Sequence, residues 1–309
     1  MIDALTTLLS SPMMQRSLLA ALIVGLTAPI IGTYLVHRRL AMLGDGIGHI
    51  SLTGVALGWL AGTFANVSPA DSWAIPGAVI ISLLGAITIE LVRQSGRTSG
   101  DTALAMLFYG GIAGGVLLIG LAGGTSAQLN SYLFGSISTV RWSDITLITG
   151  LGIAIVALGV GLAPALFSVT NDEDFARSTG LPVRTLSLLI AILSALTVAV
   201  AMRVVGSLLV SALMVIPVAI AQLGARSFRS TMAIAMALGV IICTCGLCLT
   251  YFVDLSPGAT IVVGAIGLYA IGFTIRAIVD RIRRVRRLRA ARGHNQHPER
   301  EHLAHADAS

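Results

Sequence analysis

The chain has 309 residues, of which 55% are hydrophobic and only 11% are charged, and its formal net charge is +6 at pH 7. Soluble domains of this size are usually about one-quarter charged, so the composition excludes an ordinary water-soluble protein and indicates a chain solvated mostly by lipid. All 20 basic residues are arginine. Because a phosphate-binding P-loop requires a lysine, we expect no ATP hydrolysis by this chain and no enzymatic activity.

Nine apolar segments predict membrane-spanning helices, because a helix needs about 20 apolar residues to cross the hydrocarbon. The first segment exceeds the apolar core of a signal peptide, typically about 7–15 residues, and lacks a small-x-small cleavage motif, so we expect it to be a span. The predicted fold is all-α, a polytopic transmembrane helical bundle. The nine segments are residues 17–36, 41–62, 74–92, 102–122, 145–166, 185–202, 204–223, 230–252 and 257–278.

Two regions leave the number of spans open between eight and ten. The sixth and seventh segments are separated only at Met202–Val204, and the seventh contains Pro217. This pair is therefore either a tight hairpin or a broken, partly re-entrant segment. The region 123–143 is apolar only over residues 133–137, which is too short for a full crossing.

The placement of arginine predicts the orientation of the bundle. With nine crossings and a cytoplasmic C-terminus, all of the 20 arginines except Arg16, Arg141 and Arg203 lie in cytoplasmic segments. Basic residues are enriched in cytoplasmic loops, so we expect this orientation in a bacterial cytoplasmic membrane.

The chain divides into a transmembrane domain, residues 1–280, and a basic tail, residues 281–309. We expect the arginine run from Arg281 to Arg289 to lie on anionic membrane lipid and not on nucleic acid. The rest of the tail has no apolar periodicity and is expected to be disordered. Weak metal capture by its histidines stays open; they are His294, His297, His302 and His305.

The second segment carries the strongest candidate site, Asp45 and His49. Residues four apart share one helix face, and an ionisable residue inside a span is costly and therefore a functional candidate. His49 is the only histidine within the predicted spans. A carboxylate and an imidazole together suit zinc, manganese or ferrous iron. The alternative is a hydrogen-bonded pair that holds two helices together.

An acidic loop between the fifth and sixth segments predicts a short cytoplasmic helix over residues 171–179. Thr170 and Glu173 have the spacing of a capping box, and Gly180 followed by Pro182 suits the helix end. Such a helix is either a plain connector or a docking site for a partner.

The stretch from Gly206 to Pro217 is a candidate for the transport pathway. A proline removes a helix hydrogen bond, and broken helices of this kind often line a pathway. Ser211 and Pro217 are the candidate pathway or gate residues, with a simple kink as the alternative. Further on, Cys243, Cys245 and Cys248 lie in one apolar segment, where we expect them to pack as small apolar residues, not to form a soft metal site.

Four segments in this order resemble the zinc/manganese permease family of ABC transporters, from about residue 38 to 270. The segments are Arg39–His49, Phe175–Arg184, Val204–Leu213 and Asp254–Val262. Ala176-x-x-x-Gly180 is also similar to the loop by which ABC permeases contact their ATPase. The resemblance therefore implies that Glu173, Ala176 and Gly180 couple transport to that subunit.

The family implies a homodimer of permeases that works with two ATP-binding subunits and an extracytoplasmic metal-binding protein. It implies import of zinc or manganese, with iron also compatible, and no permanently bound cofactor. Asp45 and His49 would hold the transported ion. The rival functions are an ABC permease for a metal chelate or vitamin, a secondary transporter that needs no ATPase, and a membrane-embedded enzyme. Co-purification with an ATPase would distinguish an ABC permease from a secondary transporter.

Overall fold

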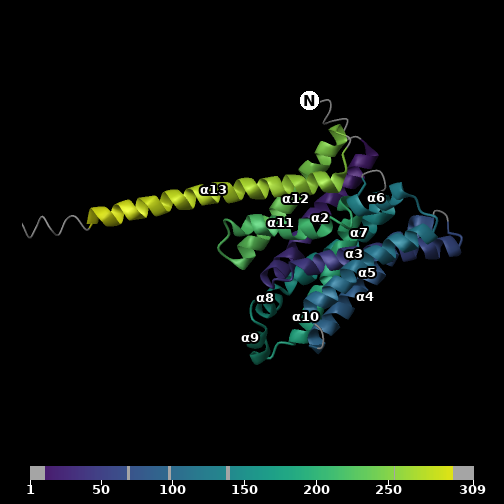
Figure 1. Ribbon diagram of the computed structural model, residues 1–309, viewed down its shortest axis with the longest axis horizontal. Coiled ribbons are helices and arrows are strands. Elements are labelled where there is room, and N and C mark those ends of the chain that lie inside the picture. The colour runs from purple at the N-terminus through teal and green to yellow at the C-terminus, as the bar shows by residue number, and fades with distance from the viewer. Residues whose placement is uncertain (1–10, 68–69, 97–98, 137–139, 254, 295–309) are drawn as a thin grey trace, which may run out of the picture. The chain divides into compact units, whose positions relative to one another are not determined.

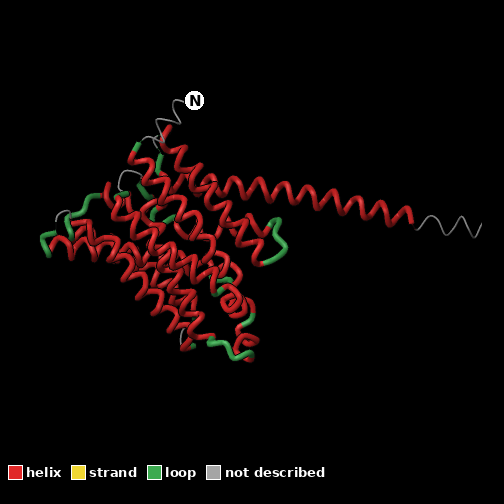
Figure 2. The backbone as a smooth tube through the Cα atoms, turned by 180° about the vertical axis from the view of Figure 1, so that it is seen from behind, coloured by secondary structure: helices red, strands yellow, loops and turns green. Residues whose placement is uncertain are grey.

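The computed structural model describes residues 11–67, 70–96, 99–136, 140–253 and 255–294, and these residues form helices joined by loops (Figures 1 and 2). Among them, eight helices are long and apolar enough to cross a membrane, judged by length and composition. They are α2 (Pro12–His37), α3 (Ala41–Phe64), α4 (Ala74–Ser95), α5 (Gly100–Leu121), α7 (Trp142–Gly161), α10 (Val183–Val205), α12 (Phe228–Phe252) and α13 (Pro257–His294). The predicted all-helical transmembrane bundle is confirmed.

The shorter helices lie at the ends of the bundle or return the chain between long helices. They are η1 (Ala70–Trp73), α6 (Ser126–Phe134), α8 (Ala163–Asn171), α9 (Glu173–Ser178) and α11 (Val210–Gln222). Figure 1 shows α8 and α9 at one end of the bundle and α6 at the other. The ambiguous region 123–143 thus contains a nine-residue helix, not a crossing.

The seventh predicted span, residues 204–223, is wrong as a full-length helix. Its helical part is α11, whose 13 residues extend about 20 Å against a hydrocarbon core of about 30 Å. The break falls at Gly206, where φ is +89° and an added Cβ would lie 2.2 Å from the Leu133 carbonyl oxygen. Only glycine allows this approach, so the chain turns there and not at Pro217, which lies inside α11.

The helix α11 nevertheless returns the chain to the end of the bundle where α10 begins. At its start, Ser207 donates a backbone hydrogen bond of 2.9 Å to Tyr132 at the end of α6. Further along, Val218 packs in one cluster with Val36, near the end of α2. The expectation of a broken segment therefore describes α10 and α11.

Close helix crossings at glycine hold the centre of the bundle together. A Cβ on Gly25 of α2 would lie 2.7 Å from the Gly239 oxygen of α12, and one on Gly239 would lie 2.2 Å from the Gly25 oxygen. Small residues at such crossings let two backbones approach and gain van der Waals contact, which drives helix association in lipid. The largest buried cluster gathers along α2 and α10, whereas α5 leaves most of its apolar surface uncovered.

The described residues from Gly267 to His294 belong to a second compact unit. Disorder was expected after the arginine run that ends at Arg289, but α13 stays helical to His294, so residues 290–294 are helical instead. Arginine, alanine and leucine all have high helix propensity, which accounts for the difference. Residues 295–309, including His297, His302 and His305, lie outside the described residues.

Candidate functional site

The helix α3 brings Asp45 and His49 onto one face, as the sequence predicted. His49 Nε2 lies 3.7 Å from Asp45 Oδ1, and the His49 side chain is 2% exposed while that of Asp45 is 25% exposed. The helix begins at Ala41, so His49 lies about 12 Å along it by the helical rise. His49 is not the only histidine in a membrane-length helix, because α2 extends to His37, whose Nδ1 lies 2.7 Å from the Thr33 carbonyl oxygen.

A third polar group reaches this pair from α11. The Ser211 hydroxyl donates a hydrogen bond of 3.1 Å to Asp45 Oδ1, across 166 positions of sequence. Ser211, a predicted pathway residue, therefore lies at the site. Pro217 is buried six residues further along α11, about 9 Å away by the helical rise, and is not brought to Asp45.

The imidazole of His49 is enclosed by neighbouring backbone and by an aromatic ring. Its ring meets Phe108 of α5 edge to face, with centroids 4.1 Å apart. Gly48 lies so close to the α10–α11 loop that an added Cβ would be 2.8 Å from the Ser207 carbonyl oxygen. Among the described residues, His49 Nδ1 and Ser207 Oγ are the buried side-chain atoms that have no hydrogen-bond partner. Such atoms are rare in folded proteins and call for a ligand or another explanation.

A cavity of about 370 Å³ opens beside Asp45. Its lining includes a second carboxylate, Asp101, at the start of α5, and also Phe108, which contacts the His49 ring. Asp45 thus faces open space while His49 lies behind Phe108. The complete lining is Met42, Asp45, Asp101, Leu104, Ala105, Phe108 and Tyr109.

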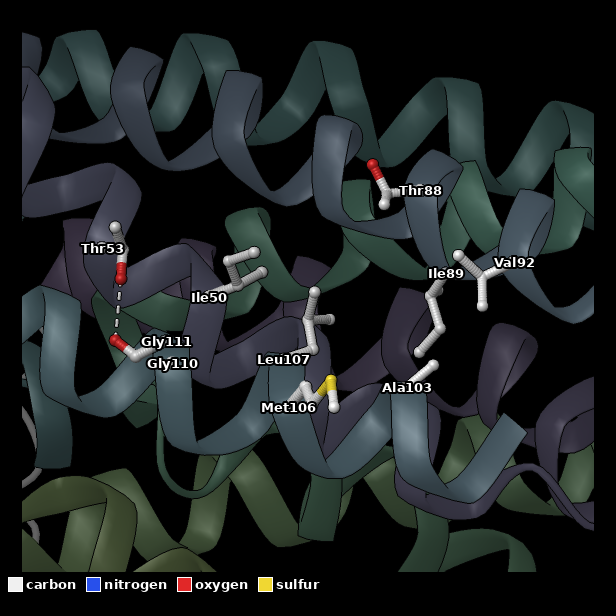
Figure 3. A pocket seen from close by; sticks show the side chains of 10 residues that line it. All are labelled: Ile50, Thr53, Thr88, Ile89, Val92, Ala103, Met106, Leu107, Gly110 and Gly111. Atoms are coloured by element: carbon white, nitrogen blue, oxygen red, sulfur yellow. Dashed lines mark hydrogen bonds between the residues drawn. The ribbon is translucent and has the colours of Figure 1, made fainter. Parts of the chain in front are cut away.

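A second cavity, of about 450 Å³, lies between α3, α4 and α5 (Figure 3). Its walls are apolar apart from Thr53 and Thr88, and the Thr53 hydroxyl already donates to the Gly111 carbonyl oxygen at 2.7 Å. It therefore lacks ligands for a metal ion. Within the part of the chain that the structure describes, no three His, Cys, Asp or Glu side chains converge, which also excludes a Cys243–Cys245–Cys248 metal site there.

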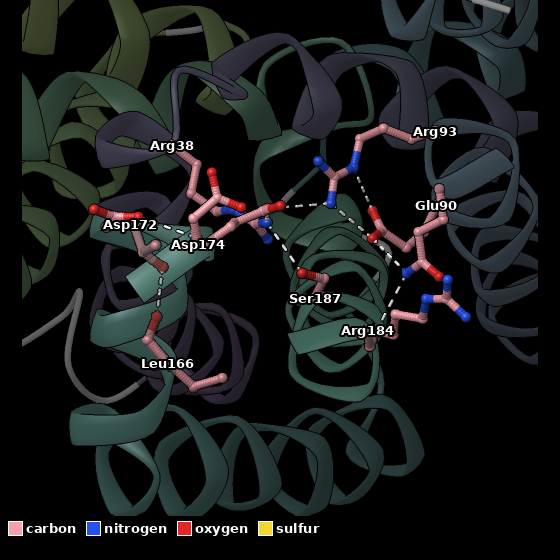
Figure 4. Close-up of polar contacts among 11 residues, drawn as sticks. Arg38, Glu90, Arg93, Leu166, Asp172, Asp174, Arg184 and Ser187 are labelled. Carbon is pink, nitrogen blue, oxygen red and sulfur yellow. Dashed lines mark hydrogen bonds and ion pairs between the residues drawn. The ribbon is translucent and has the colours of Figure 1, made fainter. Parts of the chain in front are cut away.

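The short helix predicted over residues 171–179 exists as α9, but its predicted capping box is wrong. Thr170 belongs to α8, where its hydroxyl donates to the Leu166 carbonyl oxygen at 2.6 Å. The N-cap is Asp172, whose Oδ1 accepts from the backbone of Asp174 at 3.0 Å and of Phe175 at 2.9 Å (Figure 4). The helix α8 extends through Thr170, so the chain first leaves helical geometry at Asp172.

The end of α9 follows the prediction. Gly180 adopts a left-handed conformation with φ of +82°, and its backbone donates to the Arg177 oxygen at 3.1 Å. Leu181 then donates to the Ala176 oxygen at 3.1 Å. These two bonds form a Schellman motif, which ends a helix with glycine at this position.

Two of the three predicted coupling residues face the bundle. Ala176 is fully buried, and the Glu173 carboxylate pairs with the guanidinium groups of Arg38 and Arg93. Burial lowers the pKa of the Arg38 guanidinium, and the neighbouring Glu173 carboxylate opposes that shift. The outward face of α9 instead carries Asp174, with its side chain 97% exposed, together with exposed Phe175 and Arg177.

Sequence reasoning missed Glu90, a buried carboxylate of α4. Its side chain is 4% exposed and accepts hydrogen bonds from Arg93 at 2.9 and 3.0 Å and from Gln94 at 2.8 Å. The signal was present, since Glu90 is an ionisable residue inside the predicted span 74–92 and an arginine follows three positions later. Phe108 gave no such signal, because an aromatic residue in an apolar segment is ordinary.

The profile of the ABC 3 transport family matches residues 10–276. The chain belongs to this family. Among ABC 3 relatives, the manganese transport system membrane protein MntC of Halalkalibacterium halodurans is 32% identical over 266 residues, which are 86% of this chain and 88% of that protein. The high-affinity zinc uptake system membrane protein ZnuB of Haemophilus influenzae is 29% identical over 256 residues, 82% of this chain and 94% of that protein.

Among solved structures, PsaBC from Streptococcus pneumoniae in complex with Fab is similar to this ABC 3 chain with a TM-score of 0.78 and 30% identity. The match covers 88% of this chain and 95% of the other. The family assignment and this fold likeness confirm the resemblance to ABC permeases that the four sequence segments indicated.

Proposed function

We propose that this chain is the membrane-spanning subunit of an ABC importer that carries a divalent metal ion, manganese or zinc. The observation that carries the proposal is the Asp45–His49 pair, whose carboxylate Oδ1 and imidazole Nε2 lie 3.7 Å apart beside a cavity. Relatives of similar length are named for manganese transport and zinc uptake.

The chemistry of the pair favours a first-row divalent ion. Aspartate supplies charge and histidine supplies a borderline nitrogen ligand, which suits manganese, iron or zinc better than magnesium or calcium. The 3.7 Å between Asp45 Oδ1 and His49 Nε2 is less than the roughly 4.2 Å that two metal–ligand bonds of about 2.1 Å can span, so one ion can bind both atoms. Ser211 holds the Asp45 carboxylate as an outer-sphere partner.

Two protein ligands leave the site open, as transport requires, because the ion must leave again. The remaining ligands come from water or from a second copy of the chain, with which this subunit forms a homodimer. An extracytoplasmic metal-binding protein delivers the ion. Separate ATP-binding subunits contact the exposed face of α9 around Asp174 and Phe175 and drive alternating access.

We propose that α9 and the C-terminus lie on the cytoplasmic side of a bacterial cytoplasmic membrane, because basic residues are enriched in cytoplasmic segments and most of the arginines fall on that side. Ser178→Cys, in a background with the three native cysteines replaced by alanine, tests this. A membrane-impermeant maleimide should label Cys at this position only after permeabilisation. Labelling of this cysteine in intact cells would show that the chain has the opposite orientation.

The deciding experiment is metal uptake by proteoliposomes that contain this chain and its ATP-binding subunit, with the metal-binding protein supplied on the side from which the ion is taken up. We expect ATP-dependent uptake of manganese or zinc, with competition among manganese, zinc and ferrous iron and none from calcium or magnesium at equal concentration. Uptake that needs no ATP would make the chain a secondary transporter. Uptake only of a chelate would make it a permease for larger substrates.

A further inference from the structure

Four charged side chains meet where α2, α4 and α9 come together at one end of the bundle (Figure 4). Arg38 follows the last residue of α2, Glu90 and Arg93 lie on α4, and Glu173 is the first residue of α9. We call these four residues the charge clamp. Its two positive and two negative charges balance, so it has no net charge to attract a partner.

Two members of the clamp, Arg38 and Glu90, are buried, whereas the side chains of Arg93 and Glu173 are 30% and 37% exposed. The Arg38 side chain is 4% exposed and donates to the Glu173 carboxylate and, at 3.0 Å, to the Ser187 hydroxyl of α10. At the other end, Glu90 accepts both bonds from Arg93, whose Nη2 also lies 3.5 Å from Glu173 Oε1. Buried charges held in this way have defined positions, because moving one leaves another unpaired.

Arg38 is joined to the candidate metal pair by a rigid turn. Arg39 has φ of +59°, its backbone donates to Val36, and Leu40 donates to Leu35 at 2.8 Å, so the turn is a Schellman motif. The helix α3 starts at the next residue, Ala41. A displacement of Arg38 therefore moves the start of α3, and with it Asp45 one turn further on.

The helix α9 packs on α8 and α10, and its Ala176 lies in the buried core. The Glu173 carboxylate ties it to Arg38 at the α2–α3 turn and to Arg93 of α4. Meanwhile its opposite face, with Asp174, Phe175 and Arg177, is exposed. The helix thus has an outward face free for a partner and an inward carboxylate tied to the helix that carries the candidate site.

We propose that Arg38 and Glu173 are positioning residues that couple ATP hydrolysis to ion movement. Through the charge clamp, a displacement of α9 by the ATP-binding subunit moves the α2–α3 turn and changes the access of Asp45 and His49. Glu173 therefore acts inside the permease and is not a docking contact. This inference rests on the proposed function, since it needs an ATP-driven transporter.

The test is Glu173→Gln, which removes the charge and keeps the size of the side chain. The variant is reconstituted with the ATP-binding subunit, and both ATP hydrolysis and metal uptake are measured per assembled complex. We expect normal assembly and continued hydrolysis, but uptake per ATP lowered by about fivefold or more, the usual lower range of coupling between sites. The matched control is Asp280→Asn, which removes the exposed Arg276–Asp280 pair at 3.7 Å and should leave uptake per ATP unchanged.

A second measurement uses the permease alone and does not depend on transport. Arg177 of α9 is 69% exposed, so trypsin should cleave after it whenever α9 comes away from the bundle. We expect faster release of this fragment from Glu173→Gln than from wild type. An unchanged rate would show that Glu173 does not hold α9 and would overturn the clamp.

The remaining outcomes separate the clamp from the proposed function. Absence of ATP-dependent uptake by wild type would refute the proposed function. Normal wild-type uptake with an unchanged ratio of uptake to ATP in Glu173→Gln would overturn the clamp alone. Loss of co-purification with the ATP-binding subunit would make Glu173 a docking contact, which also overturns it. If Glu173→Gln fails to insert, Arg38→Lys replaces it, because lysine keeps the charge but lacks the planar guanidinium whose Nη2 donates to both Glu173 and Ser187.

Discussion

The two charged clusters near α3 differ in how completely their members are satisfied. In the charge clamp, every side chain has an opposite charge within 3.5 Å. In the Asp45–His49 pair, the separation is 3.7 Å, Asp45 accepts one hydrogen bond from Ser211, and His49 Nδ1 is buried without a partner.

The difference separates charges that hold helices from charges that hold a ligand. A fully paired cluster gains little from a further ion. Asp45 Oδ1 and His49 Nε2, at 3.7 Å, are too far apart to hydrogen-bond to each other and would gain two bonds from an ion between them. Loss of a clamp residue should therefore reduce stability or coupling. Loss of a member of the Asp45–His49 pair should reduce ion binding and leave the fold intact.

The largest effect is expected for Asp45→Ala and His49→Ala. Loss of an outer-sphere partner of a metal ligand typically lowers affinity about 10–100-fold, so loss of a ligand itself should lower uptake by about 100-fold or more. Uptake is measured per membrane-inserted complex. The control is His37→Gln, at a histidine whose ring packs on Phe228 away from the pair, and it should transport normally.

The opposite pattern would identify Asp45 and His49 as a structural pair. In that case, either alanine variant would insert poorly, and the molecules that did insert would take up metal at the normal rate. A stable double variant with normal uptake would refute the ion site.

Glu90→Gln should destabilise the protein more than it changes transport per folded molecule. Removing one partner of a buried ion pair costs about 3–5 kcal/mol. We expect a loss of about 3 kcal/mol of folding stability, the lower end of that range. The reason is that Arg93 is 30% exposed and still has its ion pair with Glu173 in the variant. The measurement is the temperature at which half of the protein stays monodisperse in detergent. Thr88→Val on the exposed side of α4 is the control and should leave this temperature unchanged.

Glu90→Gln also provides the reference for comparing the structural contributions of the two clusters. If His49→Ala lowered the same temperature as much as Glu90→Gln did, His49 would be as structural as the clamp, and the contrast between the clusters would fail.

The helical bundle and the Asp45–His49 pair were predictable because both depend on local sequence. Apolar runs of about 20 residues mark most spans, and a spacing of four places two side chains on one helix face. The length of α11 was not predictable in this way. It depends on the contact of Gly206 with Leu133, a residue far away in the sequence.

The partners of the charged residues were also beyond sequence reasoning. Ser211 reaches Asp45 across 166 positions, and Arg38 reaches Glu173 across 135. Such contacts depend on how helices pack, which no local pattern records. The acidic loop did predict a short helix, but its inward-facing carboxylate looked the same in the sequence as its outward-facing neighbour, Asp174.

Ser211→Ala should weaken ion binding by about tenfold. The hydroxyl makes one neutral-donor hydrogen bond of 3.1 Å to Asp45, so the lower end of the outer-sphere range of about 10–100-fold applies. The measurement is the metal concentration that gives half-maximal uptake. Ser194→Ala is the control, because this buried hydroxyl donates to Ile190 within its own helix. If Ser211→Ala and Ser194→Ala changed the metal concentration for half-maximal uptake equally, Ser211 would not belong to the ion site.

The smallest expected effect is on the stability of the start of α9, and it tests whether Asp172 or Thr170 is the N-cap of this helix. Replacing an N-cap aspartate by alanine costs about 1 kcal/mol, which is roughly a fivefold larger population of opened helix. When the helix opens and closes faster than trypsin cleaves, the cleavage rate follows the population of opened helix. At low trypsin concentration, Asp172→Ala should therefore speed tryptic cleavage after Arg177 about fivefold. Thr170→Val should have no effect, because this hydroxyl bonds within α8. If Thr170→Val gave the faster cleavage and Asp172→Ala did not, Thr170 would be the cap, and α9 would begin where the sequence pattern placed it.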